Sequence, residues 1–251
     1  MLDQNLKNQV KGYLQLLERE VVISISLDDS ENSKKLRDFV DEVASLTDKI
    51  KVDEADLKFK PSFSLSSGSV SGVTFAGLPL GHEFESFILA LLQVGGRPPK
   101  IDGKTRERIE ALDEEMEFET MVSLSCHNCP EVVQALNIMA VLNPRIRHTM
   151  VDGSVFTDYV EDLGVLAVPT TYLNSEVFNN GKASLDEILN KISHEEVDLK
   201  LEEKPVFDSL VIGGGPGGAT AAIYGARKGI KVGLVAEEFG GQVKETLSIE
   251  N

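Results

Sequence analysis

The sequence predicts a mixed α/β protein in which one small α/β domain occurs twice in tandem and a third α/β unit then begins. Strand-like and helix-like segments alternate in a similar order in residues 1–100 and 101–194. Charged residues dominate the next stretch, residues 195–206, which indicates a linker. In residues 207–251 a hydrophobic strand, a glycine-rich turn and an Ala-rich helix follow one another, as in the opening of a βαβ unit.

Composition and charge exclude several classes of protein. The chain has 251 residues, with 41 acidic and 25 basic side chains, and a formal net charge of −16. Nucleic-acid binding needs lysine and arginine to offset phosphate charge, and an anionic membrane surface would repel this chain. No apolar run approaches the ~20 residues of a membrane span, and the N-terminus lacks the apolar segment of a signal peptide. We therefore expect a soluble, cytoplasmic protein that binds neither nucleic acid nor membranes.

The first domain is expected to begin with a helix and to continue as a βαβ unit. Apolar residues recur at steps of three or four over residues 2–19, which predicts an amphipathic helix. The β-branched run 21–27 predicts a strand. A turn-rich segment covers residues 67–72. The other predicted elements are a helix, two strands and a helix, in residues 30–46, 49–53, 61–65 and 83–94.

The second domain is expected to repeat this order. Strands are predicted in residues 118–125 and 146–152, and a pair of strands in residues 168–178. Helices are predicted in residues 126–143, 158–164 and 184–192. In the last of these helices, Ser184 and Glu187 have the spacing of a capping box.

Short matching segments indicate that the two domains are copies of one fold. The pairs are Ser26-Leu27 with Ser123-Leu124, Lys60-Pro61-Ser62-Phe63 with Val168-Pro169-Thr170-Thr171, and Gly77 ahead of Glu83 with Gly181 ahead of Glu187. Where the second copy has its cysteines, the first copy has Asp29-Ser30-Glu31-Asn32, so it has no dithiol of its own. The alignment needs gaps, and the alternative is two unrelated domains of similar order.

The two cysteines form one C-x-x-C motif, Cys126-His127-Asn128-Cys129, at the end of a predicted strand and the start of a helix. The positive end of the helix dipole favours a thiolate, so Cys126 is expected to be the more acidic and more exposed thiol. Cys129, one turn further on, is placed to resolve a mixed disulfide. The alternatives are a buried structural pair and a zinc site, but zinc needs about four ligands, and the remaining histidines have no zinc-site spacing.

Pro169 is the second candidate site residue. A cis proline that faces a dithiol is typical of thioredoxin-like sites, where the cis bond exposes backbone for pairing with a substrate chain. The alternative is an ordinary trans proline at a strand edge.

Gly213, Gly215 and Gly218 form a G-x-G-x-x-G motif between a hydrophobic strand and a helix. An acidic residue, Glu237, follows at the end of the next strand, with Glu238 as the alternative. This context is the dinucleotide-binding fingerprint, with a pyrophosphate at the helix N-terminus and an acid for the ribose hydroxyls. A glycine-rich turn without a ligand is the structural alternative.

Together these motifs resemble the flavoprotein (F) component of bacterial alkyl hydroperoxide reductases, and the segments FAGLPLGHEF, SLSCHNCPEVVQALN, LNPRI and EFGGQ extend the resemblance over the chain. The resemblance implies tandem thioredoxin-like folds followed by the opening βαβ unit of a Rossmann-type FAD-binding domain. It also implies an NAD(P)H-dependent enzyme in which the dithiol carries electrons from a flavin core to a two-cysteine peroxiredoxin for peroxide detoxification.

Specific roles follow from the resemblance. Cys126 would attack the peroxiredoxin disulfide, and Cys129 would resolve the intermediate. Gly213, Gly215, Gly218 and Glu237 would hold FAD, and Gly240-Gly241-Gln242 matches a G-G-Q segment near the flavin. Glu83 matches the position of an acid expected near the dithiol, where a carboxylate could accept the resolving thiol's proton. The alternative for Glu83 is an acid that interacts with the helix dipole.

The family also has a second C-x-x-C, a nicotinamide domain and the rest of the flavin domain, which this sequence lacks. We therefore expect an N-terminal fragment that needs the flavin and nicotinamide core as a partner, binds FAD poorly by itself, and dimerises only as the full-length protein. Two other classes remain: a general glutaredoxin- or thioredoxin-like reductant, and a non-catalytic interaction module.

Overall fold

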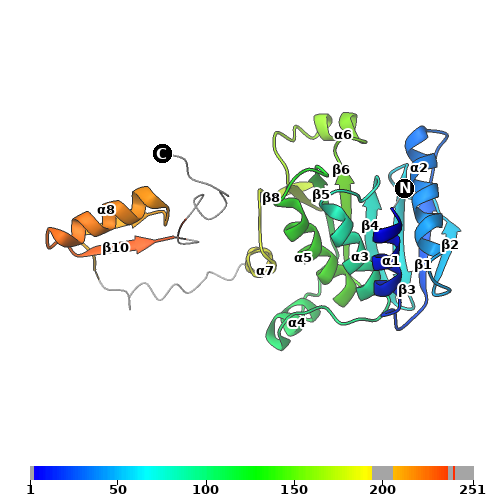
Figure 1. Ribbon diagram of the computed structural model, residues 1–251, viewed down its shortest axis with the longest axis horizontal. Coiled ribbons are helices and arrows are strands. Elements are labelled where there is room, and N and C mark those ends of the chain that lie inside the picture. The colour runs from blue at the N-terminus through cyan, green and yellow to red at the C-terminus, as the bar shows by residue number, and fades with distance from the viewer. Residues whose placement is uncertain (1–2, 194–205, 237–239, 241–251) are drawn as a thin grey trace. The chain divides into compact units, whose positions relative to one another are not determined.

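The structure is a computed structural model that describes residues 3–193, 206–236 and 240 (Figure 1). The chain divides into two compact units, Met1–Glu195 and Glu196–Asn251. The helices of the first unit are α1 (Gln4–Leu14), α2 (Glu31–Ala44), α3 (Glu83–Val94), α4 (Gly103–Glu110), α5 (Cys129–Leu142), α6 (Thr157–Asp162) and α7 (Leu185–Ile192). Its strands are β1 (Val21–Ser26), β2 (Ile50–Glu54), β3 (Ser62–Ser67), β4 (Val70–Ala76), β5 (Met116–Val122), β6 (Ile146–Asp152), β7 (Thr170–Leu173) and β8 (Glu176–Asn180).

The strands form one eight-stranded sheet in the order β2-β1-β3-β4-β6-β5-β7-β8. Its first four strands (the first copy, with α1–α3) and its last four (the second copy, with α4–α7) have the same pattern. In each copy the first strand pairs in parallel with the second and antiparallel with the third, and the third pairs antiparallel with the fourth. The predicted tandem repeat of one α/β fold is confirmed. The copies join through the parallel pair β4 and β6, from Val73 opposite His148 to Ala76 opposite Val151.

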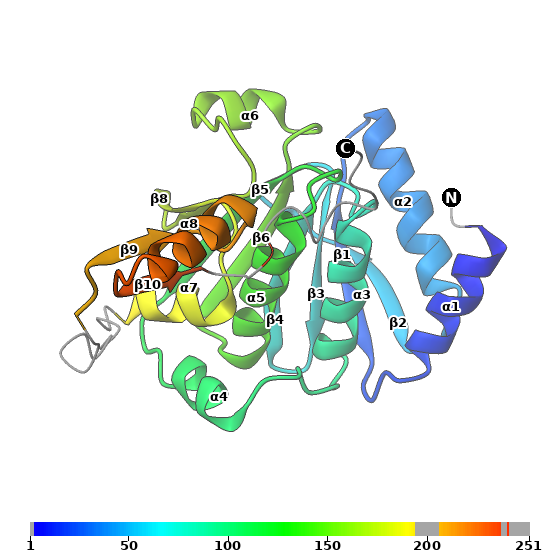
Figure 2. The ribbon, with the colours of Figure 1, turned by 60° about the vertical axis from the view of Figure 1, so that its left-hand side comes forward.

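The main core lies between the sheet and the helices. Figure 2 shows α3 and α5 side by side in front of the central strands. Phe39, Phe63, Phe75 and Phe87 are completely buried in this layer, and their rings contact one another. Successive residues of a strand point to opposite faces. Phe75 therefore belongs to this core, and the next residue, Ala76, belongs to a smaller cluster that includes residues just before and after α6.

Local signals explain where most elements begin and end. Ser30 caps α2 by accepting a hydrogen bond from the Ser33 N–H, and Ser184 and Glu187 form the predicted capping box of α7. Two predicted elements are too long: the first helix ends at Leu14, and the helix of the C-x-x-C motif begins at Cys129. The segment predicted as a turn, residues 67–72, contains the end of β3 and the start of β4, which the sequence reading missed.

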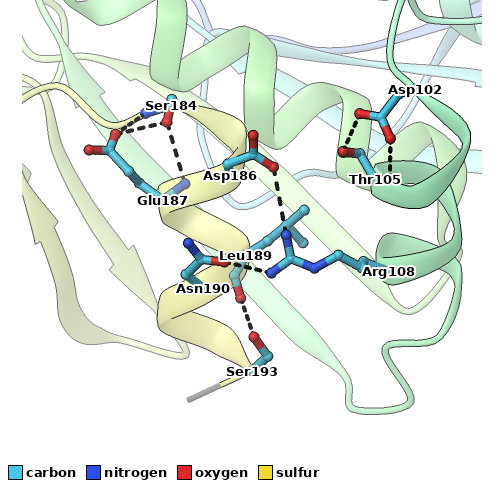
Figure 3. A network of polar contacts seen from close by, with 9 residues as sticks. All are labelled: Asp102, Thr105, Arg108, Ser184, Asp186, Glu187, Leu189, Asn190 and Ser193. Atoms are coloured by element: carbon cyan, nitrogen blue, oxygen red, sulfur yellow. Dashed lines mark hydrogen bonds and ion pairs between the residues drawn. The ribbon is translucent and has the colours of Figure 1, made fainter. Parts of the chain in front are cut away.

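The sequence reading also missed α4, which has little apolar periodicity because only Thr105 and Ile109 are buried on it. Polar contacts hold this helix instead (Figure 3). Asp102 caps it by accepting from the Thr105 N–H at 3.0 Å. Arg108 then joins it to α7 by donating to Asn190 at 2.7 Å and by an ion pair with Asp186 at 3.6 Å.

The described part of the second unit consists of β9 (Ser209–Ile212), α8 (Pro216–Arg227) and β10 (Val232–Val235). The two strands pair in parallel, from Val232 opposite Ser209 to Val235 opposite Ile212. This arrangement is the predicted βαβ unit. Across residues 3–193 and 206–236, none of the helices has the length and apolar character needed to cross a membrane.

Candidate functional site

Cys126 and Cys129 form a disulfide at the start of α5, with their Cα atoms 5.5 Å apart. Cys126 is partly exposed, whereas Cys129 is completely buried. This is the order of exposure that the sequence predicts. Only Cys126 can therefore meet an incoming molecule directly, while Cys129 faces its neighbour from the protein interior.

Sulfur takes the place of a side-chain cap at the start of α5. The Cys129 N–H donates to Cys126 Sγ at 3.1 Å, and Asn128 makes no side-chain capping bond. Pro130 follows and has no N–H to satisfy. An N–H donor and the positive end of a helix dipole at a sulfur are the features that the sequence prediction for Cys126 requires.

Pro169 lies beside this disulfide. The Val168–Pro169 bond is cis, and the Val168 carbonyl oxygen is 3.9 Å from Cys126 Sγ. The equivalent Lys60–Pro61 bond of the first copy is also cis. In each copy the proline carbonyl accepts a hydrogen bond from a matched glycine, Gly77 at 3.0 Å and Gly181 at 2.8 Å. The residues that the sequence alignment pairs, Pro61 with Pro169 and Gly77 with Gly181, thus occupy equivalent positions in the two copies.

The segment Gly81–Glu83 of the first copy contacts residues on either side of Cys126 in the second copy. The His82 N–H donates to the Leu124 carbonyl at 3.0 Å. Gly81 has φ +57°, and a Cβ there would lie 2.4 Å from the same carbonyl oxygen, so only glycine allows this approach. The exposed imidazole rings of His82 and His127 lie 4.1 Å apart, centroid to centroid.

Glu83 is completely buried in the first turn of α3. Neither of its carboxylate oxygens has a hydrogen-bond partner in the described part of the chain. Burial raises the pKa of Glu83 to about 7, and the Ser86 hydroxyl, which lies near the carboxyl without good hydrogen-bond geometry, lowers it by less. One turn further along, Gln134 Nε2 of α5 donates to Ser86 Oγ of α3 at 3.3 Å, so the first turns of the two helices lie together. The buried carboxyl and Cys129 therefore occupy neighbouring helix starts.

Sequence reasoning considered His82 only as a zinc ligand and overlooked its place beside His127. The sequence feature that could have drawn attention to His82 is that it directly precedes Glu83, a candidate site residue. Within residues 3–193 and 206–236, the structure gathers no group of three or more histidine, cysteine, aspartate or glutamate side chains able to hold a metal ion.

The glycine motif of the second unit forms a tight turn between β9 and α8. Gly213 has φ +115°, and a Cβ on Gly218 would lie 1.9 Å from the Gly213 carbonyl oxygen, so helix and strand can approach only because Gly218 lacks one. Gly215 precedes α8 and gives its N-terminus no side-chain cap. The Gly240 N–H donates to Gly214 at 2.9 Å. Glu237, Glu238, Gly241 and Gln242 lie outside the described residues.

Comparisons with known proteins agree with this geometry. A thioredoxin-domain family model matches residues 116–194. A Pseudomonas aeruginosa protein named as the F component of alkyl hydroperoxide reductase is 52% identical to this chain. The match covers the whole of this chain and 49% of that protein. The chain is a homologue of this F component. It is also 52% identical to half of a Bacillus subtilis protein named NADH dehydrogenase. The chain thus spans about half the length of the curated relatives it matches.

A solved structure of similar name resembles this chain. The N-terminal domain of the alkyl hydroperoxide reductase F component from Enterococcus faecalis is 29% identical, with a TM-score of 0.70, and the match covers 76% of this chain and 99% of that one. A protein disulfide oxidoreductase from Aeropyrum pernix has a TM-score of 0.66 at 18% identity, which shows a shared fold. The predicted thioredoxin-like fold is confirmed.

Proposed function

We propose that this chain is the dithiol relay of an alkyl hydroperoxide reductase flavoprotein. In the longer protein it would pass electrons that come from NAD(P)H through FAD to a cytoplasmic two-cysteine peroxiredoxin. The observation that carries the proposal is the placement of Cys126, partly exposed at a helix N-terminus and beside cis-Pro169. Residues 1–100 would form the copy without a dithiol, residues 101–194 the redox copy, residues 195–206 the linker, and residues 207–251 the start of the FAD-binding domain.

The transfer begins when the Cys126 thiolate attacks one sulfur of the peroxiredoxin disulfide. A bond forms between Cys126 Sγ and that sulfur, the peroxiredoxin disulfide breaks, and the electron pair leaves on its other sulfur. Cys129 then loses its proton and attacks Cys126 Sγ, which releases the second peroxiredoxin sulfur. Two electrons and two protons pass to the peroxiredoxin, which ends as a dithiol, while the chain ends with the Cys126–Cys129 disulfide.

Glu83 is proposed to accept the proton that Cys129 loses. A general base works best when its pKa lies near the working pH, and burial raises the pKa of Glu83 to about 7. The Ser86 hydroxyl lowers the pKa of Glu83, but the effect of burial is larger. The first copy thus supplies a proton acceptor to the chemistry of the second.

FAD would be held by Gly213, Gly215 and Gly218, with Glu237, Gly241 and Gln242 as further contacts. The α8 N-terminus, which has no side-chain cap, would bind its pyrophosphate. When bound, FAD supplies two-electron transfer between a nicotinamide and a dithiol. Residues 207–251 would need the flavin and nicotinamide core of the longer protein to complete this site, and that core would also provide the homodimer contact.

The test is a thiol-transfer measurement with the full chain. The chain is reduced with dithiothreitol, desalted and mixed with an oxidised two-cysteine peroxiredoxin, and free thiols on both proteins are counted by alkylation and mass spectrometry. We expect rapid transfer, its complete loss in Cys126→Ser, and a trapped covalent complex with Cys129→Ser. A folded chain with accessible thiols that transfers none would contradict the relay. Hydroxyethyl disulfide then tests for a general disulfide reductant.

A further inference from the structure

An apolar loop precedes cis-Pro169 and presents one leucine to solvent. Residues 163–168 contain no charged side chain. Leu166 is 99% exposed, the highest value among the exposed large hydrophobic residues in the described part of the chain. Single exposed leucines are common and need no explanation by themselves. The position of this one, in the same loop as Val168 beside Cys126, is what gives it significance.

The loop is anchored on both sides of Leu166. Leu163, Val165 and Val168 are partly buried against the smaller hydrophobic cluster. The Tyr172 hydroxyl donates to the Leu163 carbonyl at 3.1 Å, and the Thr170 hydroxyl donates to the Ala167 carbonyl at 2.7 Å. The neighbours are thus tied down, while Leu166 points outward. A side chain held in this way loses little backbone entropy when it binds a partner.

Acidic side chains flank the same loop. Asp158, Glu161 and Asp162 lie on α6 and are exposed. None of the three makes an ion pair with any residue that the structure describes. Figure 2 shows α6 at the edge of the unit, away from the layer formed by α3 and α5. The site therefore combines one projecting apolar side chain with unneutralised negative charge.

Disulfide exchange brings a partner chain close to this loop. The attacked sulfur must reach Cys126, whose Sγ lies 3.9 Å from the Val168 carbonyl oxygen. Leu166 is two residues from Val168, a separation that spans at most about 7 Å. Leu166 is therefore within reach of residues next to the partner's reacting cysteine.

We propose that Leu166 is a specificity-determining contact that recognises the protein carrying the substrate disulfide. It would enter an apolar recess beside that disulfide, and basic side chains around the recess would face Asp158, Glu161 and Asp162. This inference rests on the relay proposed above and deepens it, because it names the partner surface: apolar at its centre and basic at its rim.

The experiment compares a protein disulfide with a small neutral one. The reduced full chain and its Leu166→Ser variant react with an oxidised two-cysteine peroxiredoxin and, separately, with hydroxyethyl disulfide. We expect Leu166→Ser to slow transfer to the peroxiredoxin about tenfold or more, because burial of a leucine is lost. The rate with hydroxyethyl disulfide should be unchanged, because that molecule needs no docking surface.

Leu16→Ser is the matched control, since Leu16 is an exposed leucine outside this loop, just after α1. It should change neither rate. A triple variant, Asp158→Asn with Glu161→Gln and Asp162→Asn, should weaken the dependence of the peroxiredoxin rate on salt.

Equal peroxiredoxin rates for wild type and Leu166→Ser would overturn the inference. An equal slowing with hydroxyethyl disulfide would also overturn it, because the dithiol itself would then be damaged. If the wild-type chain transfers nothing to the peroxiredoxin but reduces hydroxyethyl disulfide, the relay fails, and this inference fails with it. That outcome is distinguishable because it occurs before any substitution at Leu166.

Discussion

The two copies differ most at the start of their first long helix after the opening strand. In the first copy, Ser30 caps α2 and the Asp28 carboxylate accepts the Ser30 N–H at 3.0 Å. Hydroxyl donation by Ser30 and Ser33 lowers the pKa of Asp28 to about 2. In the second copy, no side-chain oxygen caps α5, and the Cys129 N–H faces Cys126 Sγ. At the start of α2 a side-chain oxygen accepts the hydrogen bond from a backbone N–H. At the start of α5 the acceptor is a cysteine sulfur, whose charge depends on its redox and protonation state.

The same contrast occurs at the matched acids. Glu83 opens the last helix of the first copy, is buried, and has its pKa raised to about 7. Glu187 lies in the first turn of the last helix of the second copy and is exposed. The Ser184 N–H and hydroxyl donate to it at 2.7 and 2.8 Å and lower its pKa. The first copy therefore has no dithiol of its own, and its buried acid lies at the start of α3, the helix that packs against α5 of the second copy.

The largest expected effect on stability comes from Glu83→Gln. Folding raises the pKa of Glu83 from 4.5 to about 7, so ionisation opposes folding. The penalty is absent below pH 4.5, grows between pH 4.5 and 7, and is complete above pH 7. Removing the charge should therefore raise the free energy of unfolding at pH 8 by on the order of 3 kcal/mol and change it little at pH 4. Denaturant unfolding at both pH values measures this.

Glu187→Gln is the control with the opposite sign. The pKa of Glu187 is lowered on folding, so its stabilising effect is present at neutral pH and lost as the pH falls through its titration range. Glu187→Gln should destabilise the chain at pH 8 and be neutral in acid. A difference for Glu83→Gln that does not depend on pH would show that the carboxyl is not held in the buried, unpaired state described above.

A smaller difference in stability is expected between alanine substitutions at the two matched glycines. Gly77 and Gly181 both have positive φ, +98° and +87°. A Cβ on Gly77 would lie 2.8 Å from Asp152 Cβ in the second copy, whereas a Cβ on Gly181 would meet nothing within 4 Å. Gly77→Ala should therefore cost about 1–3 kcal/mol more than Gly181→Ala, because it adds a clash between the copies to the same kind of backbone strain. Equal midpoints of chemical unfolding for the two variants would contradict this.

The smallest effect tests the two helix starts directly. Ser30→Ala removes a capping hydrogen bond and should destabilise the oxidised chain by about 1 kcal/mol. Asn128→Ala removes no such bond and should leave thermal stability unchanged. If Asn128→Ala were as costly as Ser30→Ala, the start of α5 would depend on a side-chain cap, and the contrast between the copies would disappear.

Sequence reasoning could find the elements that carry local signals. Ser184 and Glu187 form a capping box within four residues, and the strand–glycine–helix context of Gly213 marks a βαβ unit by its neighbours alone. The alignment of the copies was less exact. The sequence alignment pairs Asp29 with Cys126. In the structure, α2 begins at Glu31 and α5 begins at Cys129. Asp28 and Cys126 each lie three residues before these positions, so Asp28 is the structural equivalent of Cys126. Helix α4 was missed because polar contacts, including Arg108 with Asn190, hold it in place of an apolar stripe.

By itself, the sequence determined the repeated order of strands and helices, the C-x-x-C at a helix start and the glycine motif, because periodicity, caps and turns depend on residues close together in the chain. Only the tertiary structure decided that β4 pairs with β6, that the segment Gly81–Glu83 contacts the loop before Cys126, and that Glu83 is buried. These contacts join residues far apart in the chain, and the pKa of a carboxyl depends on what packs around it rather than on its neighbours in sequence.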